Sequence, residues 1–129
     1  EHIKQVVPTE ILLPAVGQGV MAVEIREDDA EILSMLNVIN DESTEVCITA
    51  ERAFLRRLEG GCQVPIGANA VLENDEIVLH GFVGNLDGSR VIRVVIRGAK
   101  SEAESLGISL AEKYLEAGAL EILGEARAT

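Results

Sequence analysis

The feature that most constrains this chain is a series of three strand-like segments joined by short turn sequences. The segments cover residues 68–73, 76–83 and 90–97, with Asn74-Asp75 and Asp87-Gly88 between them. Turn residues at this spacing are typical of consecutive β-hairpins. In the last segment, polar side chains at Arg93 and Arg97 favour a sheet with one face in solvent. The sequence therefore predicts a three-stranded antiparallel sheet.

Helical patterns lie on both sides of this sheet. The first helix is expected to begin near Ser43 or Thr44 and to end at Gly60, because Ser caps helices and Gly commonly follows them. The last helix opens with the capping-box pattern Ser101-Glu102-Ala103-Glu104 and ends at Gly118. Together they predict an α+β fold, α-β-β-β-α, in which helices cover the sheet. The apolar faces of the two helices are Val46, Ala50, Ala53 and Leu58, and Leu106, Leu110, Tyr114 and Leu115.

The first 40 residues have a different character. Residues 1–19 show no helical period and are broken by Pro8 and Pro14, so we expect an extended connector that ends in a turn at Gly17-Gln18-Gly19. Residues 20–25 are mostly apolar and predict a buried strand. Asp28 or Asp29 can then cap a helix. Its apolar residues are Ile32, Leu33, Leu36 and Ile39.

Composition and charge exclude several classes of protein. The chain has 129 residues, and 11 Lys and Arg against 22 Asp and Glu give a net charge of −11, which argues against a nucleic-acid binder. No apolar run approaches the roughly 20 residues needed to cross a membrane. Two cysteines and no secretory signal favour a cytoplasmic protein. His2 and His80 have no Cys or His at ligand spacing, so no metal site is predicted.

The two cysteines lie in different settings. Cys47 falls on the first helix of the sheet module, as a small apolar or half-exposed residue. Cys62 lies in the loop that follows, after two glycines that leave room for a large adduct on its sulfur. The alternative is a partly buried thiol in a connecting loop.

Three segments carry a family resemblance. The longest is Glu51-Arg52-Ala53-Phe54-Leu55-Arg56-Arg57-Leu58-Glu59-Gly60-Gly61-Cys62-Gln63-Val64-Pro65-Ile66-Gly67. It resembles the cofactor-attachment signature of the porphobilinogen deaminase (hydroxymethylbilane synthase) family. Leu13-Pro14-Ala15-Val16-Gly17-Gln18-Gly19 resembles a second hallmark of this family, and residues 107–111 fall where its last helix would lie.

The resemblance implies a chemistry for these residues. The family condenses four porphobilinogen molecules into hydroxymethylbilane, with release of ammonia, on a dipyrromethane cofactor held by a cysteine thioether. The matching cysteine is Cys62, and a thiolate is suited to forming such a bond. Because the growing oligopyrrole stays attached through the cofactor, successive condensations gain from proximity. Gln18 and Gly19 match the hallmark that lines the active-site cleft and are candidates for cofactor or substrate contact.

The same resemblance implies that much of the enzyme lies outside this chain. It divides the chain into an extended connector from the end of the second domain (1–19), a returning strand and helix of an absent α/β first domain (20–40), and the cofactor-carrying domain (41–129). The catalytic Asp and the substrate-binding arginines belong to the missing N-terminal domains, so no catalytic residue is expected here and the chain alone should be inactive. Its negative charge would also repel a polycarboxylate substrate. Charged residues of the first module helix are expected to reach solvent or another domain: Glu45, Glu51, Arg52, Arg56 and Arg57.

A self-standing α+β interaction or regulatory module without catalysis is the alternative. The source reading frame would discriminate between the two, because an initiator Met directly before Glu1 favours the alternative. Residues 20–25 raise a separate question, since a strand without partners tends to associate. We expect this segment to pair with another copy, to fold back or to be disordered, with a non-native dimer favoured.

Overall fold

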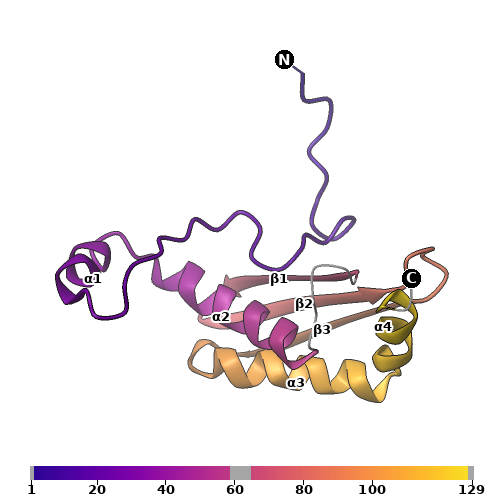
Figure 1. Ribbon diagram of the computed structural model, residues 1–129. Helices are drawn as coiled ribbons and strands as arrows, with labels where there is room; N and C mark the ends of the chain where they lie inside the picture. Colours follow the sequence, from indigo (N-terminus) through magenta and orange to yellow (C-terminus); the bar gives the residue numbers. More distant parts are fainter. Residues whose placement is uncertain (1, 59–64, 128–129) are drawn as a thin grey trace.

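The centre of the molecule is a three-stranded antiparallel sheet with helices on one face (Figure 1). The computed structural model describes residues 2–58 and 65–127. The strands pair in the order β1 (Ile66–Glu73), β2 (Glu76–Gly84) and β3 (Val91–Ala99). Helices α2 (Glu42–Arg57) and α3 (Ala103–Glu116) cover the sheet, and α4 (Ala119–Arg127) closes one end of it. The predicted α+β fold is confirmed.

The core lies between the sheet and these helices. Alternate residues of each strand face the helices, as expected for a sheet with one covered face. Phe54 and Tyr114 meet edge to face at its centre, with ring centroids 5.2 Å apart. Gly81 makes room for this pair, because a Cβ at that position would lie 2.9 Å from the Tyr114 hydroxyl. The rest of the buried core is largely aliphatic, as the scarcity of aromatic residues requires.

The first hairpin turn has the backbone that its sequence predicts. Asn74 and Asp75 both have positive φ, 50° and 67°, which is the conformation of a type I′ turn. The Asp75 carboxylate also pairs with Lys100 at 2.8 Å and thereby ties the turn to the end of β3. Both features pin the register of the sheet.

Two helix starts differ from the predictions, and one predicted helix end lies outside the described residues. Helix α2 is capped by Asp41, whose carboxylate accepts the Thr44 amide at 2.7 Å, rather than by Ser43 or Thr44. It ends at Arg57, and Gly60 lies outside the described residues. The predicted capping box at Ser101 is wrong, because Lys100–Glu102 form a 3₁₀ turn (η1) directly after β3 and no side chain caps α3.

Helix α4 was not predicted. Gly118, with a φ of +88°, ends α3 as expected and reverses the chain, and α4 then begins at Ala119. Ala119, Ile122 and Leu123 are buried in the core. The structure therefore extends the predicted module to α-β-β-β-α-α.

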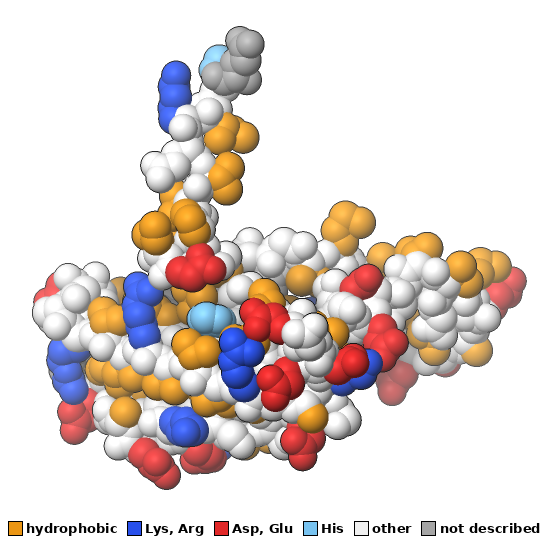
Figure 2. Space-filling view, turned by 180° about the vertical axis from the view of Figure 1, so that it is seen from behind, with side chains coloured by type: hydrophobic (Ala, Val, Ile, Leu, Met, Phe, Trp, Pro, Cys, Tyr) orange, Lys and Arg blue, Asp and Glu red, His pale blue; other side chains and the backbone are white. Residues whose placement is uncertain are grey.

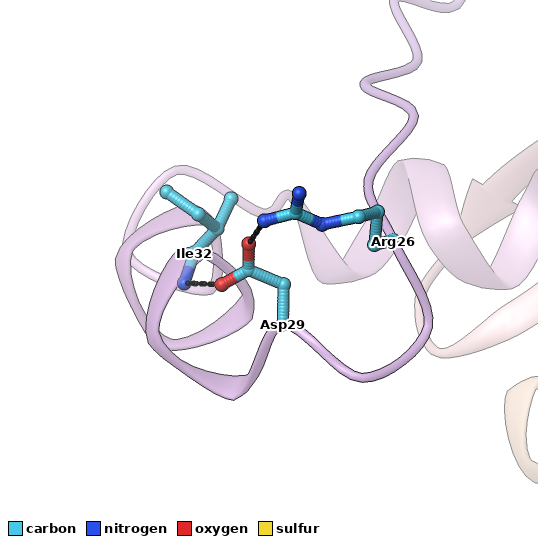
Figure 3. Close-up of polar contacts among 3 residues, drawn as sticks. All are labelled: Arg26, Asp29 and Ile32. Atoms are coloured by element: carbon cyan, nitrogen blue, oxygen red, sulfur yellow. Dashed lines mark hydrogen bonds and ion pairs between the residues drawn. The ribbon is translucent and has the colours of Figure 1, made fainter.

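Residues 20–25 do not form the predicted strand. The described sheet consists of β1, β2 and β3, and residues 20–25 pair with none of them. The predicted helix after it does form, as α1 (Ala30–Leu36), although it ends before Ile39. Figure 3 shows its start, where the Asp29 carboxylate accepts the Ile32 amide at 3.1 Å and pairs with Arg26 at 2.9 Å.

The N-terminal segment and α1 stand away from the sheet module. Figure 2 shows the segment projecting from the body and hydrophobic side chains exposed on both parts. Ile3, Met21 and Val38 are each more than four-fifths exposed. In the described part of the chain, no helix is long and apolar enough to cross a bilayer.

Candidate functional site

The two motifs that carry the family resemblance meet in the structure. The segment Leu13–Gly19 passes along β1, which is the outer strand next to α2 (Figure 1). The two ends of the longer motif, Glu51 and Gly67, both contact this segment. Sequence positions far apart are therefore joined in one junction.

Glu51 is the centre of this junction. Its Oε2 atom accepts a hydrogen bond from the amide of Gly17 at 2.9 Å, and its Oε1 atom accepts one from the amide of Ala70 at 2.8 Å. The Glu51 residue is only 7% exposed. A single buried carboxylate thus links α2, β1 and the glycine turn.

The Ala70 amide is available because β1 is an edge strand. Gly84 donates to the carbonyl of Pro65 at 3.0 Å, and hydrogen bonding alternates along an antiparallel ladder. The amides of Ile66, Ala68 and Ala70 therefore point away from β2. Glu51 supplies an acceptor to one of these edge donors, which would otherwise be buried without a partner.

Gly67 forms the second contact between the motifs. A Cβ at this position would lie 2.8 Å from the carbonyl oxygen of Pro14. No side chain larger than hydrogen fits without moving the backbone of the connector. The two backbones are in direct contact here.

Glu51 does not reach solvent, which was one of the two positions expected for it, and it contacts Gly17 of the connector instead. It is three residues from both Ile48 and Phe54, so it lies on the buried face of α2. Burial raises the pKa of its carboxyl above the ordinary value of 4.5, and the hydrogen bonds from Gly17 and Ala70 partly offset this. The i±3 spacing from two core residues is a signal that could have placed it.

The glycine turn presents Gln18 to solvent. Gly17 and Gly19 have φ values of +79° and +78°, a conformation that glycine adopts without strain. The side chain of Gln18 is exposed between them, and the backbone amide of Gln18 donates to the carbonyl of Ala15 at 3.3 Å. Gly19 lines a groove of about 650 Å³ between residues 19–25, α1 and the first half of α2, with Arg52 at its border.

Of the two cysteines, Cys47 lies among the described residues. Cys47 is half-buried on α2, and burial raises the pKa of its thiol, with further contributions from the charges of Glu51 and Asp41. These effects make it a weak nucleophile at neutral pH. Cys62, the predicted attachment residue, lies outside the described residues.

The arginines of α2 differ in their partners. Arg57 pairs with Glu112 at 2.7 Å and Arg56 lies 3.6 Å from Glu104, both on the solvent side of α3. Both side chains reach solvent, as expected for them. Arg52 is exposed and borders the groove instead.

Comparison with known proteins decides the family. Residues 45–116 match the family model "Porphobilinogen deaminase, C-terminal domain", which is more than half of the chain. The chain belongs to the porphobilinogen deaminase family. Residues 1–34 match a second model of the family, "Porphobilinogen deaminase, dipyromethane cofactor binding domain". This description names the cofactor that the sequence resemblance implied.

Curated relatives named porphobilinogen deaminase are similar over nearly the whole chain. The protein of Pelotomaculum thermopropionicum is 50% identical over 127 residues, 98% of this chain and 41% of that protein. Those of Chlorobium phaeobacteroides and Nostoc are each 46% identical, over 100% and 95% of this chain and 42% and 38% of their own length. The chain therefore spans about two-fifths of the relatives it matches.

Proposed function

We propose that this chain is the cofactor-carrying C-terminal portion of an enzyme that condenses four porphobilinogen molecules into hydroxymethylbilane with release of ammonia. The main support is the junction of the two family motifs, in which Glu51 and Gly67 hold the segment 13–19 against the sheet module. Family membership and relatives of the same name agree with this proposal.

Cys62 is the residue that holds the dipyrromethane cofactor, through a thioether. The other thiol is poorly suited, because Cys47 packs against the core and its pKa is raised. The cofactor supplies the pyrrole end to which the growing oligopyrrole is joined. The chain's own part is to provide the anchor and to keep it in a fixed place relative to the glycine turn.

The glycine turn is the second part of the proposed site. Gln18 is exposed and flanked by two glycines, so its side chain and the surrounding backbone are free to approach a bound pyrrole. We assign Gln18 and Gly19 to cofactor or substrate contact. No residue of this chain is assigned to proton transfer.

Each segment of the chain has its own place in the longer enzyme. Residues 1–19 are the connector, residues 20–40 complete the first domain of the longer enzyme, and residues 41–129 form the cofactor-carrying domain. The exposed apolar side chains of residues 20–39 are then covered by that first domain. In the isolated chain they favour a non-native dimer, and the chain alone does not catalyse the reaction.

The test uses the longer protein from which this chain comes. The intact mass of the wild-type protein should exceed the sequence mass by one dipyrromethane. The Cys62→Ser variant should lose both this mass and the consumption of porphobilinogen, whereas Cys47→Ser keeps both. An active Cys62→Ser protein would contradict the assignment of the anchor.

A further inference from the structure

We infer that Glu51 is a positioning residue, a carboxylate clasp that holds the Gly17–Gln18–Gly19 turn in register with α2 and β1. The inference rests on the proposed function for its catalytic consequence, but its structural part is independent of it. It begins from the two hydrogen bonds to the amides of Gly17 and Ala70.

The clasp joins the two elements that precede and follow Cys62 in the sequence. Glu51 belongs to α2, which leads to Cys62, and Ala70 belongs to β1, which follows it. The third group, the amide of Gly17, belongs to the turn that presents Gln18. The carboxylate therefore relates the position of the turn to both elements that carry the anchor.

A carboxylate suits this position because both partners are donors. Each of its oxygen atoms accepts one amide hydrogen, so both buried donors are satisfied. A Gln side chain of the same shape has one oxygen and one NH₂ group. In Glu51→Gln, one backbone amide would face the side-chain NH₂ group, which is also a donor. One of the two hydrogen bonds would be lost, while the volume of the side chain would stay the same.

The contact at Gly67 does not replace the clasp. It brings the backbones of Gly67 and Pro14 together, but it is a contact of shape without a hydrogen bond to the turn. Gly17 itself packs only loosely, since a Cβ there would meet Ile48 Cδ1 at 3.5 Å. Glu51 is thus a polar restraint that ties the turn to α2.

Amide hydrogen exchange of the 129-residue chain, measured residue by residue by NMR, tests the structural part. After correction for intrinsic rates, the Gly17 amide of the wild-type chain should exchange at least about tenfold more slowly than that of Gly19. Equal rates would overturn the inference, and this comparison needs no variant to fold.

The variant experiment asks whether Glu51 causes the protection. Glu51→Gln should speed exchange at Gly17 or Ala70 by at least about tenfold, with the amide of Leu79 in β2 unchanged. Glu112→Gln is the matched control, because it breaks the exposed pair with Arg57 and should leave Gly17 unaltered. An equal effect of both variants, or none from Glu51→Gln, would overturn the inference.

The catalytic consequence is tested in the longer protein. Glu51→Gln should lower kcat for porphobilinogen at least about tenfold while the dipyrromethane mass stays on Cys62. An unchanged kcat would overturn the positioning role. If the wild-type protein carried no dipyrromethane, the proposed function would fail, yet the exchange result would still decide whether the clasp exists.

Discussion

The amide of Val94 donates a hydrogen bond to the phenolic oxygen of Tyr114 at 2.8 Å, which joins the last long helix to the outer strand β3. Tyr114 is fully buried, and it is the only tyrosine in a chain that contains no tryptophan. Burial raises the pKa of its phenol to about 12. This residue is therefore an isolated optical probe of the core.

The first prediction concerns alkaline pH. The folded pKa of Tyr114 is above the ordinary value of 10, so the unfolded chain ionises first as pH rises. The contribution of this group to stability should be complete below pH 10 and lost as pH rises through 12, by roughly 3 kcal/mol in all. Phenolate absorbance near 295 nm should titrate with a midpoint near 12 in the native chain. A midpoint near 10 without unfolding would contradict the buried environment. Tyr114→Phe is the control, because it removes the titration.

The second prediction concerns the crossing of α2 and α3. A Cβ at Gly107 would lie 2.7 Å from the Ala53 Cβ and 2.9 Å from the Phe54 amide nitrogen, so the helices must separate to admit it. Gly107→Ala should lower the free energy of unfolding by about 1–3 kcal/mol or more in a denaturant titration. Gly124→Ala is the matched control, since nothing lies within 4 Å of its Cβ position in α4. It should raise stability by up to about 1 kcal/mol. Equal effects would contradict the close crossing.

The third prediction concerns mildly acidic pH. The pKa of Glu51 is raised in the folded chain, so the folded state holds the proton more tightly than the unfolded state does. The contribution of Glu51 to stability should be complete below pH 4.5 and decline as pH rises through the raised pKa. We expect the difference in unfolding free energy, wild type minus Glu51→Gln, to fall as pH rises from 4.5 through the raised pKa of Glu51. A difference that rises with pH would show that the two hydrogen bonds outweigh burial.

The fourth prediction concerns Cys47. In the Cys62→Ser variant it is the only thiol, and its burial and raised pKa should slow alkylation by iodoacetamide at pH 8. We expect the folded chain to react at least about tenfold more slowly than the same chain in guanidinium. Equal rates in the two states would show that the thiol is accessible.

Local signals predicted the sheet well. The Asn74-Asp75 turn and the pattern of residues 90–97 predict hairpins from residues that are close in sequence. The structure contains both predicted hairpins, β1–β2 and β2–β3. The strand expected at 20–25 failed because a strand needs a neighbour, which local sequence does not provide. Helix α4 was missed because Gly118 indicates the end of one helix equally well whether or not another follows.

The junction at Glu51 could not be predicted from separate sequence segments. The charge of Glu51 suggested an exposed position. In the structure its two carboxylate oxygens accept hydrogen bonds from the amides of Gly17 and Ala70, which come close to Glu51 only in the folded chain. The family motifs identified both ends of this contact. They did not show that the ends touch, and the role of Cys62 stays a prediction.

The backbone contact between Pro14 and Gly67 bears on where this polypeptide can be cut. A piece that starts at α2 would keep the three described strands with α2, α3 and α4, yet the Glu51 carboxylate would lose its Gly17 donor and, like the Ala70 amide, its cover. Val16, which packs against the core, would also be missing from that piece. The smallest piece with a complete interior therefore starts at Leu13, well upstream of the first helix it contains.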